Sequence, residues 1–489
     1  MRRISKKLLA LIISLLFVYS FLPTALCEQS AWNCPECGRT GNKGNYCGGC
    51  AHPAPWIEEN QEEESDREED ALYTYELLSN GTAKVIGYTG EAKQLIIPSK
   101  IDGYAVTHIG TAAFSNCASL TDVTLPDTVT SIENRAFSHC SNLINSTIPD
   151  SVIRIGASAF YECTGLRSIS IPDSVSNIGK SAFYGCSNLI TISLSNNLKS
   201  IEDRVFSYCT GLTSITIPDS VTSIGNHAFS NCTNLTSIGI PSSATSIGNY
   251  AFSNCISLTT IRIPDNVTNI GDYAFFNCTS LTSITMPDRL TSIASHVFYN
   301  CTGLTSITIP DSVANIRFGA FSGCSSLTSI TIPDSVNTIE DDAFFGCVSL
   351  TSIILPDVLT SIASHAFGKC IGLISFTIPN NVTNIGFSAF SGCSSLTNII
   401  IPESVRTIDA LAFSNCSNLT SIDLPDGVTT IGDYAFFRCP SLTNITIPAS
   451  VTSIGWNIFQ ESPEVIVSVS AGSFAEQYCK ANNIPIKYK

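Results

Sequence analysis

Four cysteines near the start of the chain have the spacing of a metal site. Cys34 and Cys37 form one CxxC pair, Cys47 and Cys50 form a second, and nine residues separate the two pairs. Each pair can place two thiolates on one ion, and two pairs complete the tetrahedral sulfur set that zinc prefers. A site closed in this way is structural, because it leaves no coordination position for a substrate or water. The alternative is a pair of disulfides, which export to an oxidising compartment would favour.

The segment that carries these cysteines, residues 32–53, resembles a small zinc ribbon. Proline and glycine stand inside and after the two pairs and favour the metal over the disulfides. We therefore expect one structural zinc ion bound by the four cysteines, with the nearby His52 as a bystander.

A further fifteen cysteines recur every 23 residues, from Cys117 to Cys439. Neighbouring coils of a stacked repeat bring equivalent Cα atoms near the ~4.4–6.8 Å that a disulfide accepts, so bridges between coils are one alternative. An odd number of cysteines cannot pair completely, and each one stands between a phenylalanine column and a leucine column where a small apolar group is needed. The pattern favours buried free thiols.

Histidine and aspartate also recur at fixed positions. His227, His296 and His365 share one column, but successive members are three coils apart, which is roughly 14 Å and too far to share a metal ion. Aspartate follows the proline of many units, where it could bridge calcium ions or bond its own turn amides, and the turn role is favoured. These aspartates are Asp127, Asp150, Asp173, Asp219, Asp265, Asp288, Asp311, Asp334, Asp357 and Asp426. No GxSxG, HExxH or phosphate-loop motif is present, so we expect no enzyme activity.

The element that positions these columns is a unit of approximately CxxLTSITIPDSVTSIGxxAFxx. In the stretch 212–218, LTSITIP, alternation places isoleucines inward and hydroxyl side chains outward, which predicts one short strand per unit. The proline then ends strand pairing. A second extended segment is expected at 221–224, and the phenylalanine column from Phe114 to Phe459 should fill the interior. Because a unit of this size cannot bury its own apolar face, the coils must stack.

The repeated IPxSVTSIGxxAFxxC string resembles the BspA-like class of leucine-rich repeats over residues 95–460. The resemblance implies a solenoid that is mostly β, with a parallel strand stack, short turns or 3-10 segments, and little regular helix. Proteins of this class occur on the surfaces of bacteria and some protists and are implicated in attachment to host proteins and surfaces. The resemblance therefore implies a similar place and role for this chain.

The rest of the chain divides by composition. Four basic residues precede an apolar run at 8–21, which is the layout of a secretory signal, and no later run reaches the ~18–20 apolar residues of a membrane span. Cys27 raises the alternative of a lipid anchor, although Leu26 stands where such signals want a small residue. The expected segments are a signal peptide at 1–27, the four-cysteine module at 32–53, an acidic linker at 57–70, an N-terminal cap at 71–109, the solenoid at 110–462 and a C-terminal cap at 463–489.

Charge excludes one class of partner. The formal net charge is −15, and removing the four basic residues of the signal gives −15 − 4 = −19. Nucleic acid is therefore an unsuitable partner, because phosphates demand clusters of lysine and arginine. A secreted or cell-surface location follows from the signal.

The outward strand positions are mostly serine and threonine, which gives a flat, neutral face. These hydroxyls satisfy strand propensity and cross-strand contacts, and they could also meet an extracellular protein or glycan through many weak hydrogen bonds. Departures from the pattern are the candidate ligand-binding residues, because the coil does not need them: Asp122, Arg262, Ile354, Ile400 and Asp423. Adhesion or binding is the leading hypothesis, and a structural spacer of the cell envelope without a specific ligand is the alternative.

Overall fold

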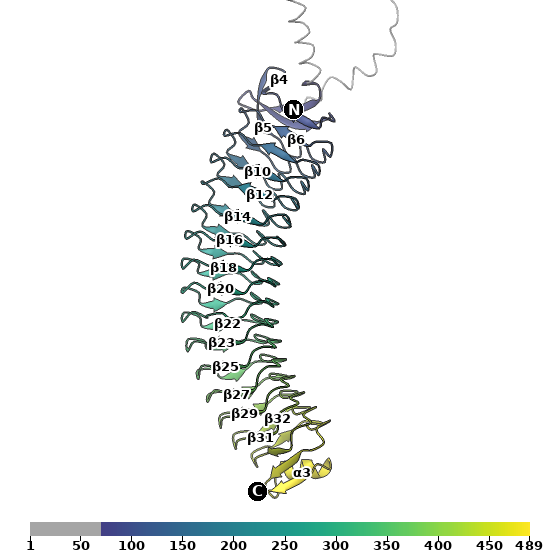
Figure 1. The fold of residues 1–489 in the computed structure, drawn as a ribbon, viewed down its shortest axis with the longest axis vertical. Coiled ribbons are helices and arrows are strands. Elements are labelled where there is room, and N and C mark those ends of the chain that lie inside the picture. The colour runs from purple at the N-terminus through teal and green to yellow at the C-terminus, as the bar shows by residue number, and fades with distance from the viewer. Residues whose placement is uncertain (1–69) are drawn as a thin grey trace, which may run out of the picture.

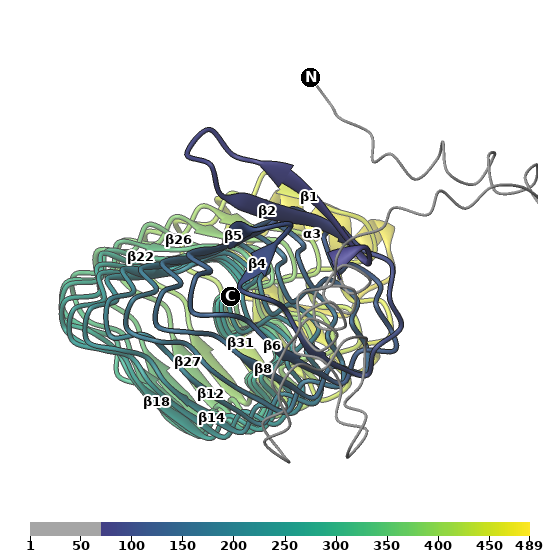
Figure 2. The same cartoon turned by 90° about the horizontal axis from the view of Figure 1, so that it is seen from above.

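The chain folds as a stack of flattened coils that forms a long, curved solenoid of about 18 turns (Figure 1). The computed structural model describes residues 70–489. Seen from above, each coil has two extended sides that face each other across the interior (Figure 2). The leucine-rich-repeat solenoid predicted from the 23-residue unit is confirmed.

Sheet A is the stack formed by the first strand of each coil. In the unit at Leu212, the strand covers only Ser214–Thr216 because Pro218 ends the ladder two residues later. Neighbouring strands are parallel and shifted by one unit, as in the pairs Ser214 with Ser237 and Thr216 with Gly239. The strands of sheet A are β3 (Gln94–Ile96), β6 (Asp122–Thr124), β8 (Asn145–Thr147), β10 (Ser168–Ser170), β12 (Thr191–Ser193), β14 (Ser214–Thr216), β16 (Ser237–Gly239), β18 (Thr260–Arg262), β20 (Ser283–Thr285), β23 (Ser329–Thr331), β25 (Ser352–Ile354), β27 (Ser375–Thr377), β29 (Asn398–Ile400), β31 (Ser421–Asp423), β33 (Asn444–Thr446), β35 (Ile466–Val469) and β36 (Ile486–Tyr488).

Sheet B is the opposite stack and contains the second extended segment of each coil. Its strands are short because glycine or an equivalent residue begins a new turn directly after the inward isoleucine. They are β2 (Ala83–Tyr88), β5 (Tyr104–Ile109), β7 (Ser131–Ile132), β9 (Arg154–Ile155), β11 (Asn177–Ile178), β13 (Ser200–Ile201), β15 (Ser223–Ile224), β17 (Ser246–Ile247), β19 (Asn269–Ile270), β21 (Ser292–Ile293), β22 (Asn315–Ile316), β24 (Thr338–Ile339), β26 (Ser361–Ile362), β28 (Asn384–Ile385), β30 (Thr407–Ile408), β32 (Thr430–Ile431) and β34 (Ser453–Ile454).

The segment that returns the chain from sheet B to sheet A, which we call the hook, consists of successive turns. Two residues of each hook adopt a left-handed conformation, as His227 (φ 55°) and Asn231 (φ 61°) do in one coil. This conformation directs their amides toward the next coil, where His227 N donates to Asn249 O (2.8 Å) and Asn231 N to Ser253 O (2.7 Å). The hydrogen bonds between neighbouring coils therefore offset the cost of the left-handed backbone in the hook.

Phenylalanine fills the interior at the hook side of every coil. The column is an unbroken stack from Phe114 to Phe459, with neighbouring ring centroids 5.1–5.8 Å apart and interplanar angles up to 21°. Offset pairs of this kind contribute about 0.5–1.5 kcal/mol each beyond the buried area. The stack explains why a coil depends on its neighbours and why stability is close to a sum of neighbour terms.

Both ends of the solenoid carry atypical elements. At the N-terminal end β1 (Tyr73–Leu77) forms an antiparallel hairpin with β2, and β4 (Lys100–Ile101) pairs antiparallel with β5. At the other end β35 extends sheet A, the helix α3 (Phe474–Ala481) follows, and β36 closes the sheet. These elements cover coil ends that would otherwise expose unpaired strand edges.

Candidate functional site

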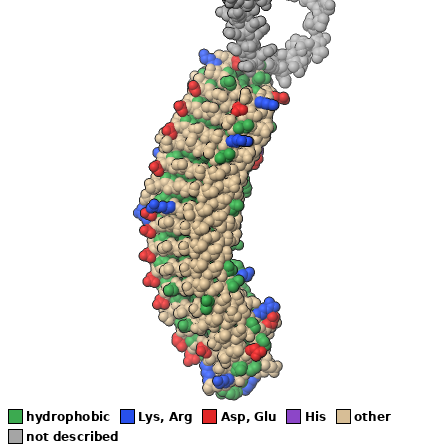
Figure 3. All heavy atoms as spheres, in the orientation of Figure 1, with side chains coloured by type: hydrophobic (Ala, Val, Ile, Leu, Met, Phe, Trp, Pro, Cys, Tyr) green, Lys and Arg blue, Asp and Glu red, His purple; other side chains and the backbone are tan. Residues whose placement is uncertain are grey.

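The exposed side of sheet A, here called the outer face, carries hydroxyl groups in three rows. Threonines that precede the strands use their hydroxyls internally: Thr236 Oγ1 donates to Thr213 O (3.2 Å) and Thr282 Oγ1 to Thr259 O (3.1 Å). The first strand position, exemplified by Ser214, forms row 1, and the third, exemplified by Thr216, forms row 2. In the space-filling view this face is largely free of charged and apolar side chains (Figure 3).

Rows 1 and 2 keep their hydroxyls free in the middle of the solenoid. From β14 to β20, no side-chain hydrogen bond is made by a hydroxyl of either row, although the structure describes every one of these residues. The hydroxyls are those of Ser214, Thr216, Ser237, Thr260, Ser283 and Thr285. A hydroxyl can both donate and accept, so this surface offers unused hydrogen-bonding capacity to a ligand.

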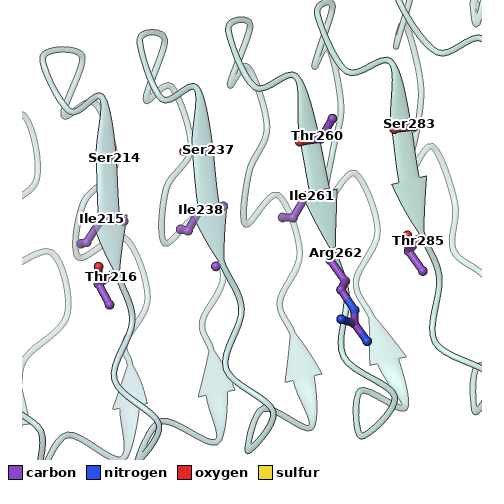
Figure 4. A pocket seen from close by; sticks show the side chains of 11 residues that line it. Ser214, Ile215, Thr216, Ser237, Ile238, Thr260, Ile261, Arg262, Ser283 and Thr285 are labelled. Carbon is purple, nitrogen blue, oxygen red and sulfur yellow. The ribbon is translucent and has the colours of Figure 1, made fainter.

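A groove of about 500 Å³ lies across these same four strands. Its floor consists of Ile215, Ile238 and Ile261, whose side chains are buried, and its rims are rows 1 and 2 (Figure 4). The groove exists because Gly239 interrupts row 2, where the neighbouring coils have larger side chains. A Cβ atom built on Gly239 would meet nothing within 4 Å, so the missing side chain leaves open space and not a close backbone contact.

Arg262 lies at the same row position one coil after Gly239 and lines the groove, and its side chain extends past the C-terminal end of β18 (Figure 4). It is exposed, and among the residues that the structure describes its guanidinium makes no ion pair and no hydrogen bond. From β6 to β33 it is the single basic residue in rows 1 and 2. An unpaired cation thus stands in a groove with free hydroxyls on both sides.

The other candidate residues from the sequence do not join this groove. Ile354, Ile400 and Asp423 occupy row 2 with Arg262, but four or more coils further along the stack. Asp122 lies in row 1 near the N-terminal end, where its carboxylate accepts from Thr121 Oγ1 (2.8 Å). Ile354 and Ile400 are 80% and 56% exposed, so they form a separate apolar interruption of the outer face.

The cysteine ladder has a structural explanation. All ladder cysteines are free thiols, and those after Cys117 are buried. Each buried thiol donates to the carbonyl of the phenylalanine 26 residues earlier, as Cys301 Sγ does to Phe275 O (3.1 Å). Ser462, which follows the last ladder cysteine, makes the same bond to Phe436 O (2.8 Å). Burial raises the pKa of the Cys301 thiol to about 12, which keeps it protonated. The expectation of buried thiols in place of bridges is confirmed.

The aspartate of the Pro-Asp-Ser turn does not make the turn bonds that the sequence predicts. The serine secures the turn: Ser220 Oγ donates to Leu198 O (2.6 Å) in the previous coil, and most other coils repeat this bond. Apart from Asp173, which accepts from Asn196 N, the ten aspartates make no side-chain hydrogen bond within residues 70–489. The turn role given to aspartate is wrong, because the turn is closed by a backbone bond, Val221 N to Pro218 O (3.0 Å), and is secured by the serine bond to the previous coil.

The histidine column forms an aromatic row that the sequence reasoning missed. His227, Tyr250, Tyr273 and His296 stack ring on ring, with centroids 4.5–4.8 Å apart and interplanar angles of 1–7°. Partial burial lowers the pKa of both histidines. The intervening tyrosines at the same unit position were the available signal, because equal positions in successive coils must lie in contact. Within residues 70–489, no group of three or more His, Cys, Asp and Glu side chains could hold a metal ion.

The predicted zinc ligands Cys34, Cys37, Cys47 and Cys50 lie outside the described residues, as do the signal peptide and nearly all of the acidic linker. Within residues 70–489, no helix has the length and apolar character that crossing a membrane requires.

A family profile described as the BspA type leucine-rich repeat region, of six copies, matches residues 107–236, 222–351 and 337–466. The chain belongs to this family. Among solved structures, a leucine-rich repeat protein from Bacteroides ovatus is 31% identical to this BspA-type chain, over 86% of this chain and 98% of its own, with a TM-score of 0.60. A leucine-rich cell surface protein from Faecalibacterium prausnitzii is 28% identical, over 83% of this chain and 95% of its own, with a TM-score of 0.43. No curated protein matches this chain.

Proposed function

We propose that this BspA-type protein is a secreted or cell-surface binding protein that meets an extracellular protein or glycan through its outer face. The observation that carries the proposal is the set of unengaged hydroxyls around the groove at Gly239 and Arg262. The fold explains a side chain that packs within a coil or bonds a neighbouring coil. These hydroxyls do neither, so the fold does not explain them. The solenoid fold itself is typical of binding or scaffold proteins, so we propose no catalytic activity.

The location rests on two kinds of support. The basic and apolar start of the chain has the layout of a secretory signal. The similar protein from Faecalibacterium prausnitzii is described as a leucine-rich cell surface protein. Adhesion to host or neighbouring cells is the finer form of the same proposal.

The test is a binding screen of the purified full chain against extracellular-matrix proteins and glycans. A matched variant replaces hydroxyls of row 1 by alanine at Ser214, Ser237 and Ser283, which no coil uses for hydrogen bonding. Saturable binding that this variant weakens, at unchanged thermal stability, is the expected outcome. Binding to no member of the panel would favour the spacer of the cell envelope.

We also propose that the four-cysteine module holds one structural zinc ion. Its support is the spacing of the two CxxC pairs, which suits a tetrahedral thiolate site. Metal analysis of the purified protein should find one zinc ion per chain. Replacing Cys34 and Cys37 by serine should abolish it, and a mass two hydrogens lighter per disulfide, without metal, would contradict the proposal.

A further inference from the structure

We propose that the groove at Gly239 and Arg262 binds an acidic polysaccharide, with an anionic group of the sugar chain on the guanidinium of Arg262 and sugar hydroxyls on rows 1 and 2. The inference rests on the proposed binding function and names the chemistry of its ligand. Four observations carry it: the groove, the unpaired guanidinium, the free hydroxyls around it, and the charge of the rest of the molecule.

Arg262 supplies the contact with the anionic group of the sugar chain. Its guanidinium presents a planar fork of N–H donors that fits a carboxylate or sulfate in two-point contact. Nothing in the described part of the chain already occupies that fork. Threonine holds the corresponding row 2 position in the coils of β14 and β20, so the fold does not need an arginine there.

Gly239 supplies the space for the sugar chain. The absence of its side chain opens row 2 between Thr216 and Arg262, and Gly239 and Arg262 line the same groove. The backbone of Gly239 is not among the residues with positive φ, and its Cβ direction is empty. Glycine is therefore not required by the conformation, and the space it leaves is the distinctive feature of this position.

The hydroxyl rows distinguish a sugar chain from an acidic peptide. Sugar hydroxyls and the side chains of Ser214, Ser237 and Ser283 can each donate or accept, so they can pair in either sense along the groove. The floor of three isoleucines lies below a shallow surface and has no deep pocket for an apolar side chain of a peptide. A flat array of weak, paired hydrogen bonds around one strong ionic contact suits a polysaccharide.

Charge explains why the interaction would be local. The chain carries a formal net charge of −15, which opposes unspecific binding of any polyanion. Along the edge of the solenoid the exposed aspartates add to this repulsion, and Figure 3 shows acidic side chains repeated down that edge. A polyanion that binds must therefore do so at a particular cation, and rows 1 and 2 offer only Arg262 between β6 and β33.

The experiment measures binding of the purified full chain to four immobilised polymers: hyaluronate, sulfated dextran, neutral dextran and polyglutamate. Hyaluronate and sulfated dextran separate the carboxylate from the sulfate as the anionic group, and binding to either, with neither neutral dextran nor polyglutamate binding comparably, is the expected result. Equal binding of polyglutamate would show that the site takes acidic peptides, and equal binding of neutral dextran would show that Arg262 is irrelevant. Either result would overturn the proposal.

Three variants localise the site. Arg262→Thr restores the common residue of row 2 and should weaken binding about 10- to 100-fold, as expected for loss of a charge-assisted contact. Gly239→Thr fills the groove without backbone strain and should weaken binding while leaving Arg262 in place. Arg167→Thr removes an equal charge from an exposed position that most coils fill with threonine and should leave binding unchanged. Unchanged thermal unfolding shows that each variant folds.

The outcomes also separate this inference from the proposed function. If none of the four polymers binds but a matrix component binds in the wider screen and the row 1 variant weakens it, the acidic polysaccharide is wrong and the binding function stands. If Arg262→Thr leaves polysaccharide binding unchanged, the polysaccharide does not bind in the groove. If neither the polymers nor the matrix panel bind, both proposals fail.

Discussion

Replacing one ladder cysteine tests whether the thiols serve the fold through a hydrogen bond. Cys301 is fully buried, and its Sγ donates to Phe275 O at 3.1 Å. Cys301→Ala leaves a cavity of about one methyl group, which costs about 1 kcal/mol, and removes a weak donor worth about 0.5–1 kcal/mol. Phe275 O keeps a second partner, Cys278 N at 3.2 Å, so no buried carbonyl is left without a bond. We expect a total loss of about 1.5–2 kcal/mol.

Cys301→Ser should cost less than Cys301→Ala, because the hydroxyl can take over the bond to Phe275 O. Ser462 shows that a serine at the equivalent position reaches the phenylalanine carbonyl at 2.8 Å. Hydrogen exchange is the suitable assay, because a solenoid opens locally and need not unfold in one step. Amides of the coils around Cys301 should exchange about 10- to 30-fold faster in the alanine variant.

The order of the two variants decides the question. The serine variant must be more protected than the alanine variant in reducing buffer, and Ser462→Ala should lower protection in the last coils in the same way. If serine and alanine cost the same, or if adding a reductant alone loosens the native protein, the thiols act through disulfides or packing alone and the hydrogen-bond account is refuted.

Four further outcomes follow from the structure. Among the ladder cysteines, Cys117, which is half-buried and has a thiol pKa of about 11, should be alkylated first at pH 8, while a ladder thiol with a pKa of about 12 in place of 9.0 should react about 1,000-fold more slowly than a free thiol, as peptide mapping would show. Thermal stability should fall as the pH drops below 6.5, because the lowered pKa values of His227 and His296 let the unfolded chain bind protons before the folded chain does, and replacing both by asparagine should flatten this dependence. Phe275→Ala should cost about 3–5 kcal/mol by calorimetry, since it interrupts two ring contacts. Deleting residues 339–407, which removes three whole units, should leave a folded protein with an intact groove, to be checked by circular dichroism and polysaccharide binding.

The solenoid could be predicted because its information is repeated. Each position of the unit recurs in every coil, so its residue type indicates repeatedly whether that position is buried or exposed. The cysteine, phenylalanine and isoleucine positions indicate burial throughout the array. The two strands per coil, their parallel pairing and the buried thiols follow from that pattern and are found in the structure.

The left-handed residues of the hook were harder to foresee. The position before each cysteine is rich in asparagine and glycine, which tolerate positive φ. The position of Tyr250 and Leu411 in the unit also has positive φ, although neither tyrosine nor leucine favours it. Hydrogen bonds to the next coil stabilise the conformation there, and that tertiary cause leaves no mark on residue type.

The groove was found only in part from the sequence. Arg262 was recognised because a charge in a hydroxyl column is conspicuous. Gly239 breaks the same column one unit earlier, but a missing side chain in a sequence does not show whether it leaves space or lets another backbone approach closely. Only the structure shows that the direction of its Cβ is empty.

The arrangement of the breaks argues that Gly239 and Arg262 form one site. Exposed positions of a solenoid can vary freely, but two successive coils that remove a side chain and add an unpaired cation side by side produce a recess with a charge at its edge. The three-unit block at 270–338 is repeated at 339–407, and the groove lies before the first copy. The duplication repeats the threonines, the thiols and the position of His296, while Gly239 and Arg262 are the single glycine and the single arginine of row 2 between β6 and β33. A feature that the repeat does not generate, and that the fold does not need, is where the ligand specificity of this protein should be sought.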